Sequence, residues 1–434
     1  MAPSRGTFID LFAGCGGLSL GLMAAGWKGL FAVEQDANAF ETLKYNLIDG
    51  HPNCPHRFHW PSWLNREPIE ISHFLRTRAS ELARLKGAVE LIAGGPPCQG
   101  FSLAGRRKLN DPRNRLFKHY VDFVKVIEPN FLLIENVKGI SVGFRKHHKG
   151  GAGEIKSSEP YSEKIKDSLN AAGYKVFTRL IRAAEVGVPQ FRPRYIMLAV
   201  RARLLATRPN FDPFHDFDER RKKFLNVKGL PVDRAVTVRQ AISDLETYGA
   251  ELIDCADSVG FKQIQYAYPR TKYQRLMHGS LNGTAPNSLR LANHRDDTRW
   301  RFRQILATCR RGVQMSASDR ERFGLKKHCV VPLDGDRPSH TLTTLPDDIL
   351  HYSEPRILTV REYARLQSFP DWYEFRGNYT TGGRRRVKEC PRYTQAGNAV
   401  PPFLAEVIGL LTKGITSELE SSRKTVDRIR RNSK

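Results

Sequence analysis

A cysteine with the surroundings of a nucleophile lies at position 98, within the sequence GGPPCQGFS of residues 94–102. The two prolines restrict the backbone just before Cys98, so that its thiol is presented in one conformation. Five basic residues follow before position 116, and nearby positive charge lowers the pKa of a thiol, whose thiolate is the reactive form. We therefore expect Cys98 to act as a nucleophile rather than as a buried packing residue.

A carboxyl group is expected at the same place in the fold. The apolar run 90–93 precedes the cysteine segment, and the run 131–134 leads directly into Glu135. Both runs are typical of buried strands, and parallel strands end at a common edge of their sheet. A cysteine and a glutamate at one edge indicate covalent attack assisted by an acid.

A glycine-rich turn, AGCGG at residues 13–17, follows the apolar segment 7–12 and precedes helix-forming residues 18–25. A second apolar run, 30–33, then ends at Glu34, twenty residues after Gly14. Glycines let a ligand approach backbone amides, and an acid at this spacing can accept both hydroxyls of a ribose. The turn is not the dinucleotide fingerprint, and by itself an ordinary strand-to-helix turn stays open as an alternative.

The alternation of these strands with helical segments predicts an α/β fold with a parallel sheet. A helix is expected over 116–127, and a closing pair of strands over 175–181 and 194–200. After position 208 the periodicity weakens while arginine and aromatic residues become frequent, which indicates a second, irregular domain. Further helices are expected over 359–366 and 402–411.

Composition limits the partners. The 434 residues include 70 Lys and Arg against 45 Asp and Glu, a net charge of +25 that favours a polyanion such as nucleic acid. No apolar run approaches the ~20 residues of a membrane span, and no secretory signal is visible at the N-terminus. Seven scattered cysteines do not resemble a disulfide framework, so a reducing compartment is expected.

Together, DLFAGCGG, PPCQGFS and ENV resemble the motifs of the DNA (cytosine-5)-methyltransferases of the prokaryotic, restriction-modification type. The family's later motifs are matched in order by PQFRPR (189–194), RILTVRE (356–362), RLQSFPD (365–371) and QAGNAVPP (395–402). The resemblance covers residues 7–200 and about 334–412. It implies a Rossmann-like, S-adenosylmethionine-dependent methyltransferase sheet with helices on both faces, plus a smaller, irregular target recognition domain.

The resemblance also implies a mechanism. Cys98 would attack carbon 6 of a cytosine flipped out of the duplex, and Glu135 would hold the exocyclic amino group and the adjacent ring nitrogen. Carbon 5 would then take the methyl group of S-adenosylmethionine. Arg194 would contact the cytosine carbonyl oxygen, Arg192 would support it and the neighbouring phosphate, and Gln190 would fix the local geometry.

The same likeness assigns residues to the cofactor and to DNA. Glu34 would bind the ribose, while Glu70 stands nearest to the position where the family carries an aspartate that contacts adenine. The remaining cofactor residues would be Phe12, Gly14, Gly16, Pro96, Asn398, Ala399 and Val400. The predicted DNA contacts are Gln99, Ser102, Arg106, Arg107 and Arg113, in and before a loop that closes over the flipped base, and Arg299 and Arg301 in the recognition region.

The expected organisation is a catalytic domain over 1–205, completed by 390–420, a recognition domain over 206–389, and a basic tail over 421–434. We expect a monomer that acts on double-stranded DNA beside the nucleoid, in the cytoplasm of a prokaryotic or phage-infected cell. A cognate restriction endonuclease is a possible partner. The crowded His51, Cys54, His56 and His59 have no ordinary zinc spacing, and the chemistry needs no metal.

Two alternatives stay open at this point. A tRNA cytosine-5 methyltransferase would use the same scaffold, although Ser102 and the roughly 150-residue variable region favour DNA. A DNA-binding relative without catalysis is the second alternative, and the intact Cys98, Glu135 and Arg194 argue against it.

Overall fold

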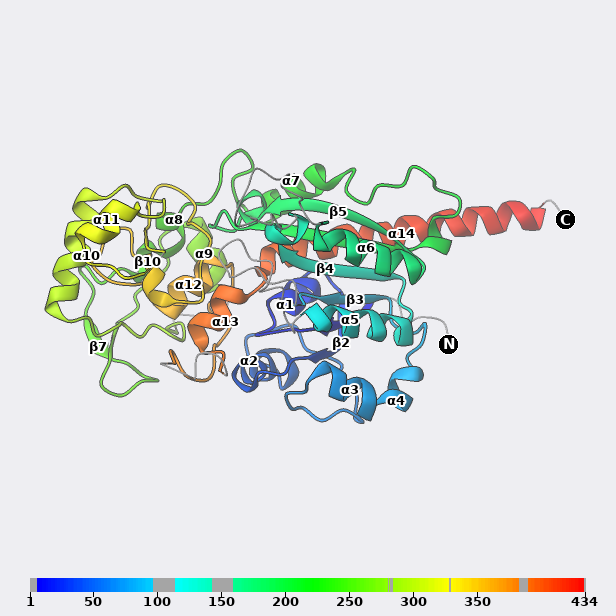
Figure 1. The fold of residues 1–434 in the computed structure, drawn as a ribbon, viewed down its shortest axis with the longest axis horizontal. Helices are drawn as coiled ribbons and strands as arrows, with labels where there is room; N and C mark the ends of the chain where they lie inside the picture. Colours follow the sequence, from blue (N-terminus) through cyan, green and yellow to red (C-terminus); the bar gives the residue numbers. More distant parts are fainter. Residues whose placement is uncertain are drawn as a thin grey trace, which may run out of the picture.

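The structure is a computed structural model, and it describes residues 6–96, 114–142, 159–279, 281, 284–327, 329–381 and 389–432. A central sheet flanked by helices forms one part of the protein, and a lobe of short helices and loops lies at one end of it (Figure 1). The α/β fold class is confirmed by this arrangement.

The sheet has six strands in the order β2-β1-β3-β4-β6-β5. Strands β2, β1, β3 and β4 pair in parallel, as expected, whereas β6 pairs antiparallel with both β4 and β5. The expectation of a parallel sheet is wrong for β6 alone, which runs opposite to the other five strands because the short connection from β5 has no crossover helix. The strands are β1 (Thr7–Leu11), β2 (Lys28–Val33), β3 (Leu91–Gly94), β4 (Phe131–Val137), β5 (Tyr174–Arg182) and β6 (Pro193–Arg201).

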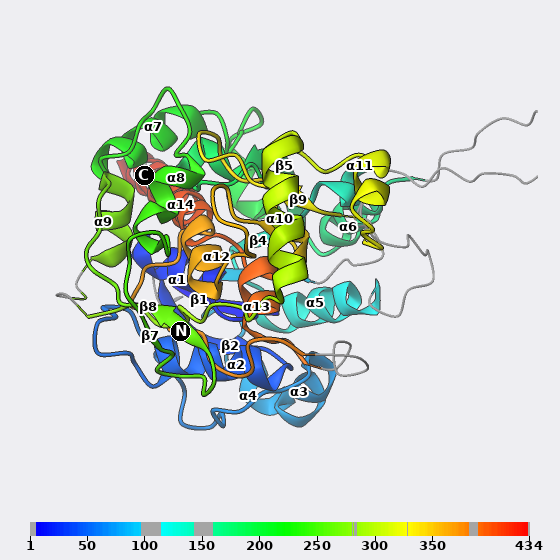
Figure 2. The ribbon, with the colours of Figure 1, turned by 90° about the vertical axis from the view of Figure 1, so that its left-hand side faces the viewer.

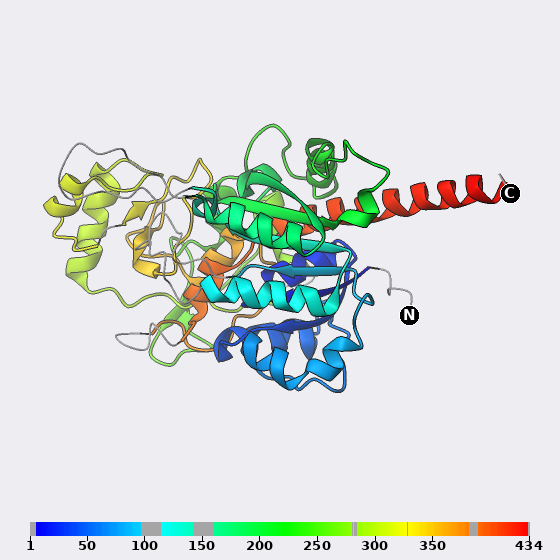
Figure 3. The same ribbon diagram turned by 45° about the vertical axis from the view of Figure 1, so that its right-hand side comes forward.

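Helices cover both faces of the sheet, because successive strand residues point to opposite sides. Phe8 packs into the larger hydrophobic core, which includes the apolar residues of α1 and α14, while Ile9 packs into a second core that includes those of α5. Figure 3 shows α5 and α6 in front of the sheet, with α14 behind it. The helices of this part are α1 (Gly17–Ala24), α2 (Ala37–Leu43), α3 (Ile71–Thr77), α4 (Ala79–Ala83), α5 (Asn114–Ile127), α6 (Tyr161–Ala171) and α14 (Pro402–Asn432).

The segment 51–66 covers the exposed edge of the sheet. His59 donates a backbone hydrogen bond of 2.8 Å to Gly29 on the edge strand β2. The rings of Trp60 and Trp63 lie 6.5 and 5.8 Å from that of Phe31, which β2 contributes to the core. Covering an edge strand in this way prevents it from pairing with another chain.

The lobe at the end of the sheet consists of short helices and strands joined by loops (Figure 2). The larger core continues through residues such as Phe217 and Leu358, whereas two small clusters, around Ile305 and Ile264, are separate from it. The domain boundaries at 205 and 390 stay predictions. Helix α7 (Phe217–Val227) packs against α14 beside the sheet, where the rings of Phe224 and Phe403 lie 5.6 Å apart. The elements of the lobe are α8 (Val238–Ile242), β7 (Leu252–Asp254), β8 (Lys262–Ile264), α9 (Lys272–His278), α10 (Asp296–Thr308), α11 (Ala317–Arg322), β9 (Val331–Pro332), β10 (Ile349–Leu350), α12 (Val360–Leu366) and α13 (Arg392–Asn398).

Helix α14 continues to Asn432, so the backbone of the predicted basic tail is helical, and it extends beyond the sheet (Figure 1). Among the described residues, one stretch, Arg392–Leu419, is long and apolar enough to cross a membrane, and 67% of it is buried inside the protein. Its packing is close, since a Cβ on Gly21 of α1 would lie 2.3 Å from the carbonyl oxygen of Pro402. Core packing therefore accounts for its apolar character.

Candidate active site

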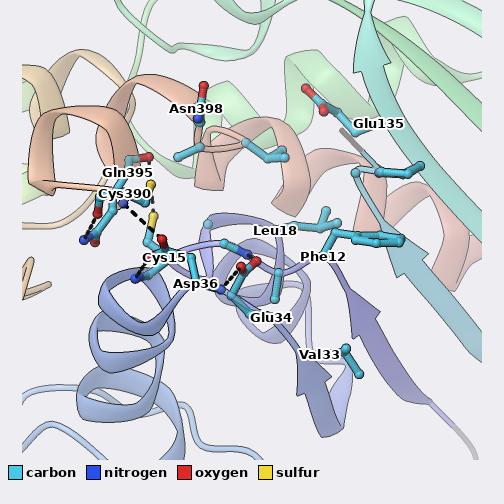
Figure 4. A pocket seen from close by; sticks show the side chains of 18 of the residues that line it. Phe12, Cys15, Leu18, Val33, Glu34, Asp36, Glu135, Cys390, Gln395 and Asn398 are labelled. Carbon is cyan, nitrogen blue, oxygen red and sulfur yellow. Dashed lines mark hydrogen bonds between the residues drawn. The ribbon is translucent and has the colours of Figure 1, made fainter. Parts of the chain in front are cut away.

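A cavity of about 380 Å³ opens at the carboxyl ends of the parallel strands (Figure 4). It brings together side chains from β1, β2, β3, β4, β6 and α13, which are far apart in the sequence. Ten of the predicted site residues line it: Phe12, Gly14, Glu34, Pro96, Glu135, Arg192, Arg194, Asn398, Ala399 and Val400.

The glycine-rich turn forms the floor of the cavity. Phe12 and Gly14 both have positive φ, at 60° and 55°, which turns the chain sharply after β1. A Cβ on Gly17 would lie only 2.3 Å from the carbonyl oxygen of Val400, so only glycine allows the start of α1 to approach that loop. Gly16 does not line the cavity; at φ 90° it packs against the side chains of Leu43 and Tyr373.

Glu34 ends β2 and points into the cavity (Figure 4). Its carboxylate accepts backbone hydrogen bonds from Gly14, at 2.8 Å, and from Asp36, at 2.7 Å. Burial raises the pKa of Glu34, although these hydrogen bonds act in the opposite direction. Each carboxylate oxygen has a second lone pair, so Glu34 can also accept two hydroxyl groups from a ligand.

Asp36 is a site residue that the sequence reasoning missed. It caps α2 by accepting a hydrogen bond of 2.9 Å from the Ala39 amide, and its other oxygen accepts one of 3.0 Å from the Cys390 amide. It lines the cavity together with Cys390 and Gln395, two further residues that were not predicted. An aspartate immediately before a helix is an N-cap signal, but its contact with residue 390 depends on the fold.

Glu70 is not among the residues that line the cavity; its neighbours Ile69 and Ile71 are. The Glu70 carboxylate caps α3 and accepts hydrogen bonds from the Ser72 and His73 amides at 3.0 and 2.9 Å. The Ile69 amide donates to the Glu34 carbonyl oxygen at 2.7 Å, which holds this segment beside the end of β2. The two isoleucines therefore give this wall of the cavity an apolar surface.

An ion pair occupies the other end of the cavity. Nε of Arg194, on β6, lies 2.5 Å from a carboxylate oxygen of Glu135, at the end of β4, and both side chains are about nine-tenths buried. Burial lowers the pKa of Arg194, while the charge of Glu135 acts to raise it. The next residue, Asn136, donates a hydrogen bond of 3.1 Å to the Pro96 carbonyl oxygen, which fixes the backbone two residues before Cys98.

Arg192 is buried between this ion pair and the loop after α13. Its Nη2 donates to the Ala399 carbonyl oxygen at 3.1 Å, while its Nε has no hydrogen-bond partner among the described residues. Burial lowers the pKa of Arg192, and the adjacent charge of Arg194 lowers it further. A buried guanidinium with an unused donor is suited to an anionic or carbonyl group of a ligand.

Gln190 lies behind the cavity rather than in its wall. Its amide nitrogen donates to Oε1 of Gln367 at 2.9 Å and to the Leu366 carbonyl oxygen at 3.1 Å, and its oxygen accepts from the Leu342 amide at 2.9 Å. Gln367 in turn donates to the Ala396 carbonyl oxygen at 2.7 Å. This network joins three distant segments of the chain behind the two arginines.

Comparison with known proteins identifies the family. Residues 6–412 match the C-5 cytosine-specific DNA methylase family. The chain belongs to this family. It is 31% identical to the type II methyltransferase M.XorII of Xanthomonas oryzae over 92% of this chain and 83% of that protein, and 31% identical to M.DdeI of Desulfomicrobium norvegicum over 92% and 86%.

A solved structure supports the same assignment. It is assigned as a DNA modification methyltransferase encoded within a prophage (E. coli), and it is 25% identical, with a TM-score of 0.62 over 95% of this chain and 99% of that one. This DNA (cytosine-5)-methyltransferase therefore shares its α/β fold with other DNA methyltransferases, and the cavity lies at the sheet edge where such folds bind their ligands.

Several predicted residues of this methyltransferase lie outside the described residues: Cys98, Gln99, Ser102, Arg106, Arg107 and Arg113. The predicted contacts Arg299 and Arg301 are described, and both belong to α10, where Arg299 is exposed and Arg301 is half-buried.

Proposed function

We propose that the cavity holds S-adenosylmethionine and the target cytosine side by side, so that the enzyme methylates carbon 5 of cytosine in double-stranded DNA. The observation that carries this proposal is the continuity of the cavity: one space runs from Glu34, at the end of β2, to the Glu135–Arg194 pair, at the ends of β4 and β6. Two ligands bound at its two ends would share a boundary where a group can be transferred.

The residues at the first end fit the methyl donor. Glu34 would accept the two ribose hydroxyls, and the apolar surfaces of Phe12, Ile69 and Ile71 would enclose the adenine. The Asn398–Val400 loop, which packs closely against Gly17, would enclose the methionine part of the donor. Bound there, S-adenosylmethionine supplies an electrophilic methyl group.

At the second end, we propose that the Cys98 thiolate adds to carbon 6 of the flipped cytosine and forms a carbon–sulfur bond. Glu135 would hydrogen-bond the exocyclic amino group and the adjacent ring nitrogen, where charge develops as the ring accepts electrons. Carbon 5 thereby becomes nucleophilic. After methylation, loss of the carbon-5 proton to solvent would allow the sulfur to leave, which restores the aromatic ring and the free thiolate.

The two arginines would hold the base. Arg194, fixed by Glu135, would donate to the cytosine carbonyl oxygen, and the unused donor of Arg192 would support it or the adjacent phosphate. The Gln190 network would keep both guanidinium groups in place, which makes Gln190 a positioning residue. Its support from three chain segments favours a rigid site.

The biological role that we propose is protection of DNA against a cognate restriction endonuclease. Relatives that share 31% identity with the chain are named type II methyltransferases. We further propose that the protein acts as a monomer on nucleoid DNA in the cytoplasm, with the lobe that carries α10 reading the target. The net charge of +25 supports a polyanionic partner.

Bisulfite sequencing tests the proposal in a bacterial host that has no methylation of its own. One culture would express the unaltered protein, a second Cys98→Ala, and a third Glu135→Gln, with equal soluble protein in each. Protected cytosines within one short motif, present only with the unaltered protein, are expected. Protection that persists in Cys98→Ala, or no protection in DNA at all, would overturn the proposal, and cellular tRNA would then be the next substrate to assay.

A further inference from the structure

The hairpin β7–β8 of the lobe is tied directly to the helix that walls the cavity. Asp257 lies in the loop between the two strands, and its carboxylate forms an ion pair with Nη1 of Arg392, the first residue of α13, 135 positions later in the chain. The other carboxylate oxygen accepts a hydrogen bond of 2.7 Å from the Tyr379 hydroxyl. The Arg392 side chain is 10% exposed and that of Asp257 is 29% exposed.

Stacked rings and backbone contacts hold this junction in place. The guanidinium of Arg290 lies between the rings of Phe261 and Tyr379, at 4.2 and 3.9 Å, and the guanidinium of Arg392 lies 4.2 Å from the Tyr379 ring. Arg392 also donates to the Gly377 carbonyl oxygen at 2.9 Å. The Arg392 side chain is therefore held by several neighbours, and Asp257 is its charged partner.

Helix α13 connects Arg392 to the cavity. It is only seven residues long, roughly 10 Å, and it presents Gln395 and Asn398 to the cavity wall. It packs closely against the segment at Thr343, because a Cβ on Gly397 would lie 2.4 Å from the Thr343 carbonyl oxygen. Gln395 also accepts a hydrogen bond of 2.7 Å from Thr42 of α2. A change at Arg392 would therefore move the residues that face the cavity.

We propose that Asp257 is a positioning residue, which sets the shape of the methyl-donor end of the cavity through Arg392 and α13. The recognition lobe thereby contributes to cofactor binding without touching the cofactor. This inference rests on the proposed function, in which S-adenosylmethionine occupies that end. Because Gln395 and Asn398 of α13 face the cavity at the donor end, we expect loss of the ion pair to affect donor binding more than the chemical step.

The test compares Asp257→Asn with Asp254→Asn. Asp254 lies on the same hairpin and pairs with Lys262 at 2.7 Å, but this exposed pair lies within the hairpin. We expect Asp257→Asn to raise the KM for S-adenosylmethionine about tenfold, a typical strength of coupling between two sites, with kcat unchanged. Asp254→Asn is expected to leave both constants unchanged, and Asp257→Glu, which keeps the charge, to recover part of the affinity.

An unchanged KM in Asp257→Asn overturns the inference, and so does a fall in kcat and melting temperature at unchanged KM, which is the result of a merely structural role. Tyr379→Phe provides a milder variant if Asp257→Asn does not fold, because it removes one hydrogen bond to Asp257; it should raise the KM by a smaller factor. Isothermal titration of the unaltered protein and of Asp257→Asn with S-adenosylmethionine distinguishes failure of the proposed function from failure of this inference. No binding there defeats the proposed function and the inference with it, whereas binding that is equal in the variant defeats the inference alone.

Discussion

Arginines have opposite roles in the lobe that carries α10: some near its base are buried, and two on α10 are exposed. Arg365 of α12 is fully buried, with its Nε 2.6 Å from Asp371 and its Nη2 3.1 Å from Asp244. On α10, Phe302 and Ile305 pack into a small core, which leaves Arg299 and Arg303 exposed on the opposite side. The same side chain is thus part of the scaffold in one region and available to a partner in the other.

The difference shows why net charge alone is a weak guide to a binding surface. A buried guanidinium in the scaffold is stabilised by pairing, because removing an ion from water is costly. Arg356 follows the same rule, since it bonds Glu354 and Glu362 at 2.6 and 2.8 Å. Some of the arginines are therefore neutralised by carboxylates inside the protein, and the exposed arginines are the candidates for phosphate contact.

The largest effect is expected from Arg365→Met. The substitution leaves Asp244 and Asp371 buried without their main cationic partner, so it should lower the free energy of unfolding by about 3–5 kcal/mol. Urea denaturation measures this loss. Arg303→Met on α10 is the matched control, with an expected change within about 0.5 kcal/mol. Equal effects of the two substitutions would erase the contrast between the regions.

A buried carboxylate without a cationic partner shows what burial does to a charged group that is not paired. Asp10 is fully buried; Ser19 donates to one of its oxygens at 2.5 Å, and the other has no partner among the described residues. Burial raises the pKa of Asp10 to about 7. Between about pH 4 and pH 7 the folded protein therefore keeps a proton that the unfolded chain has released, so the stability from this group is full at low pH and is lost as the pH rises.

Asp10→Asn should then be more stable than the unaltered protein at pH 8, by about 2–4 kcal/mol, and similar to it at pH 4. Thermal or urea unfolding at both pH values measures the difference. A pH-independent difference between the two proteins would show that Asp10 is not titrating in this range. Asp371, whose pKa is held below its ordinary value by the charge of Arg365 despite burial, should show the opposite trend, with stability lost as the pH falls.

Local patterns predicted that Gly14 and Glu34, twenty residues apart, lie together, and they meet at 2.8 Å. Arg194, which was named through the family resemblance, meets Glu135 from the start of the antiparallel strand β6. The apolar runs specify the strands, and the parallel order of four of them brings their ends to one edge. Proximity at this edge therefore follows from patterns that are visible in the sequence.

Contacts between distant segments could not be predicted in this way. Nothing around Asp257 indicates a partner at Arg392, and Arg290, which the sequence shows only as one of many basic residues, is enclosed by two rings. Glu70 was named as the nearest candidate for the family's adenine contact, and the structure shows its carboxylate bonded to amides of its own helix. Such pairings depend on how the lobe packs against the sheet, and the residues next to each partner in the sequence do not indicate this packing.

The smallest effects are expected on α10, and they test the exposed side of the comparison. If Arg299 contacts a phosphate, Arg299→Ala should weaken DNA binding similarly for all sequences and reduce the slope of log affinity against log salt by about 1. Arg66→Ala is the control, because Arg66 is about half-exposed but lies on the edge-covering segment and pairs with Asp49. Affinities measured between about 50 and 200 mM salt decide the matter. An unchanged slope for Arg299→Ala would mean that exposure on α10 reflects solvation alone, and a changed slope for Arg66→Ala would extend the DNA contact beyond the lobe that carries α10.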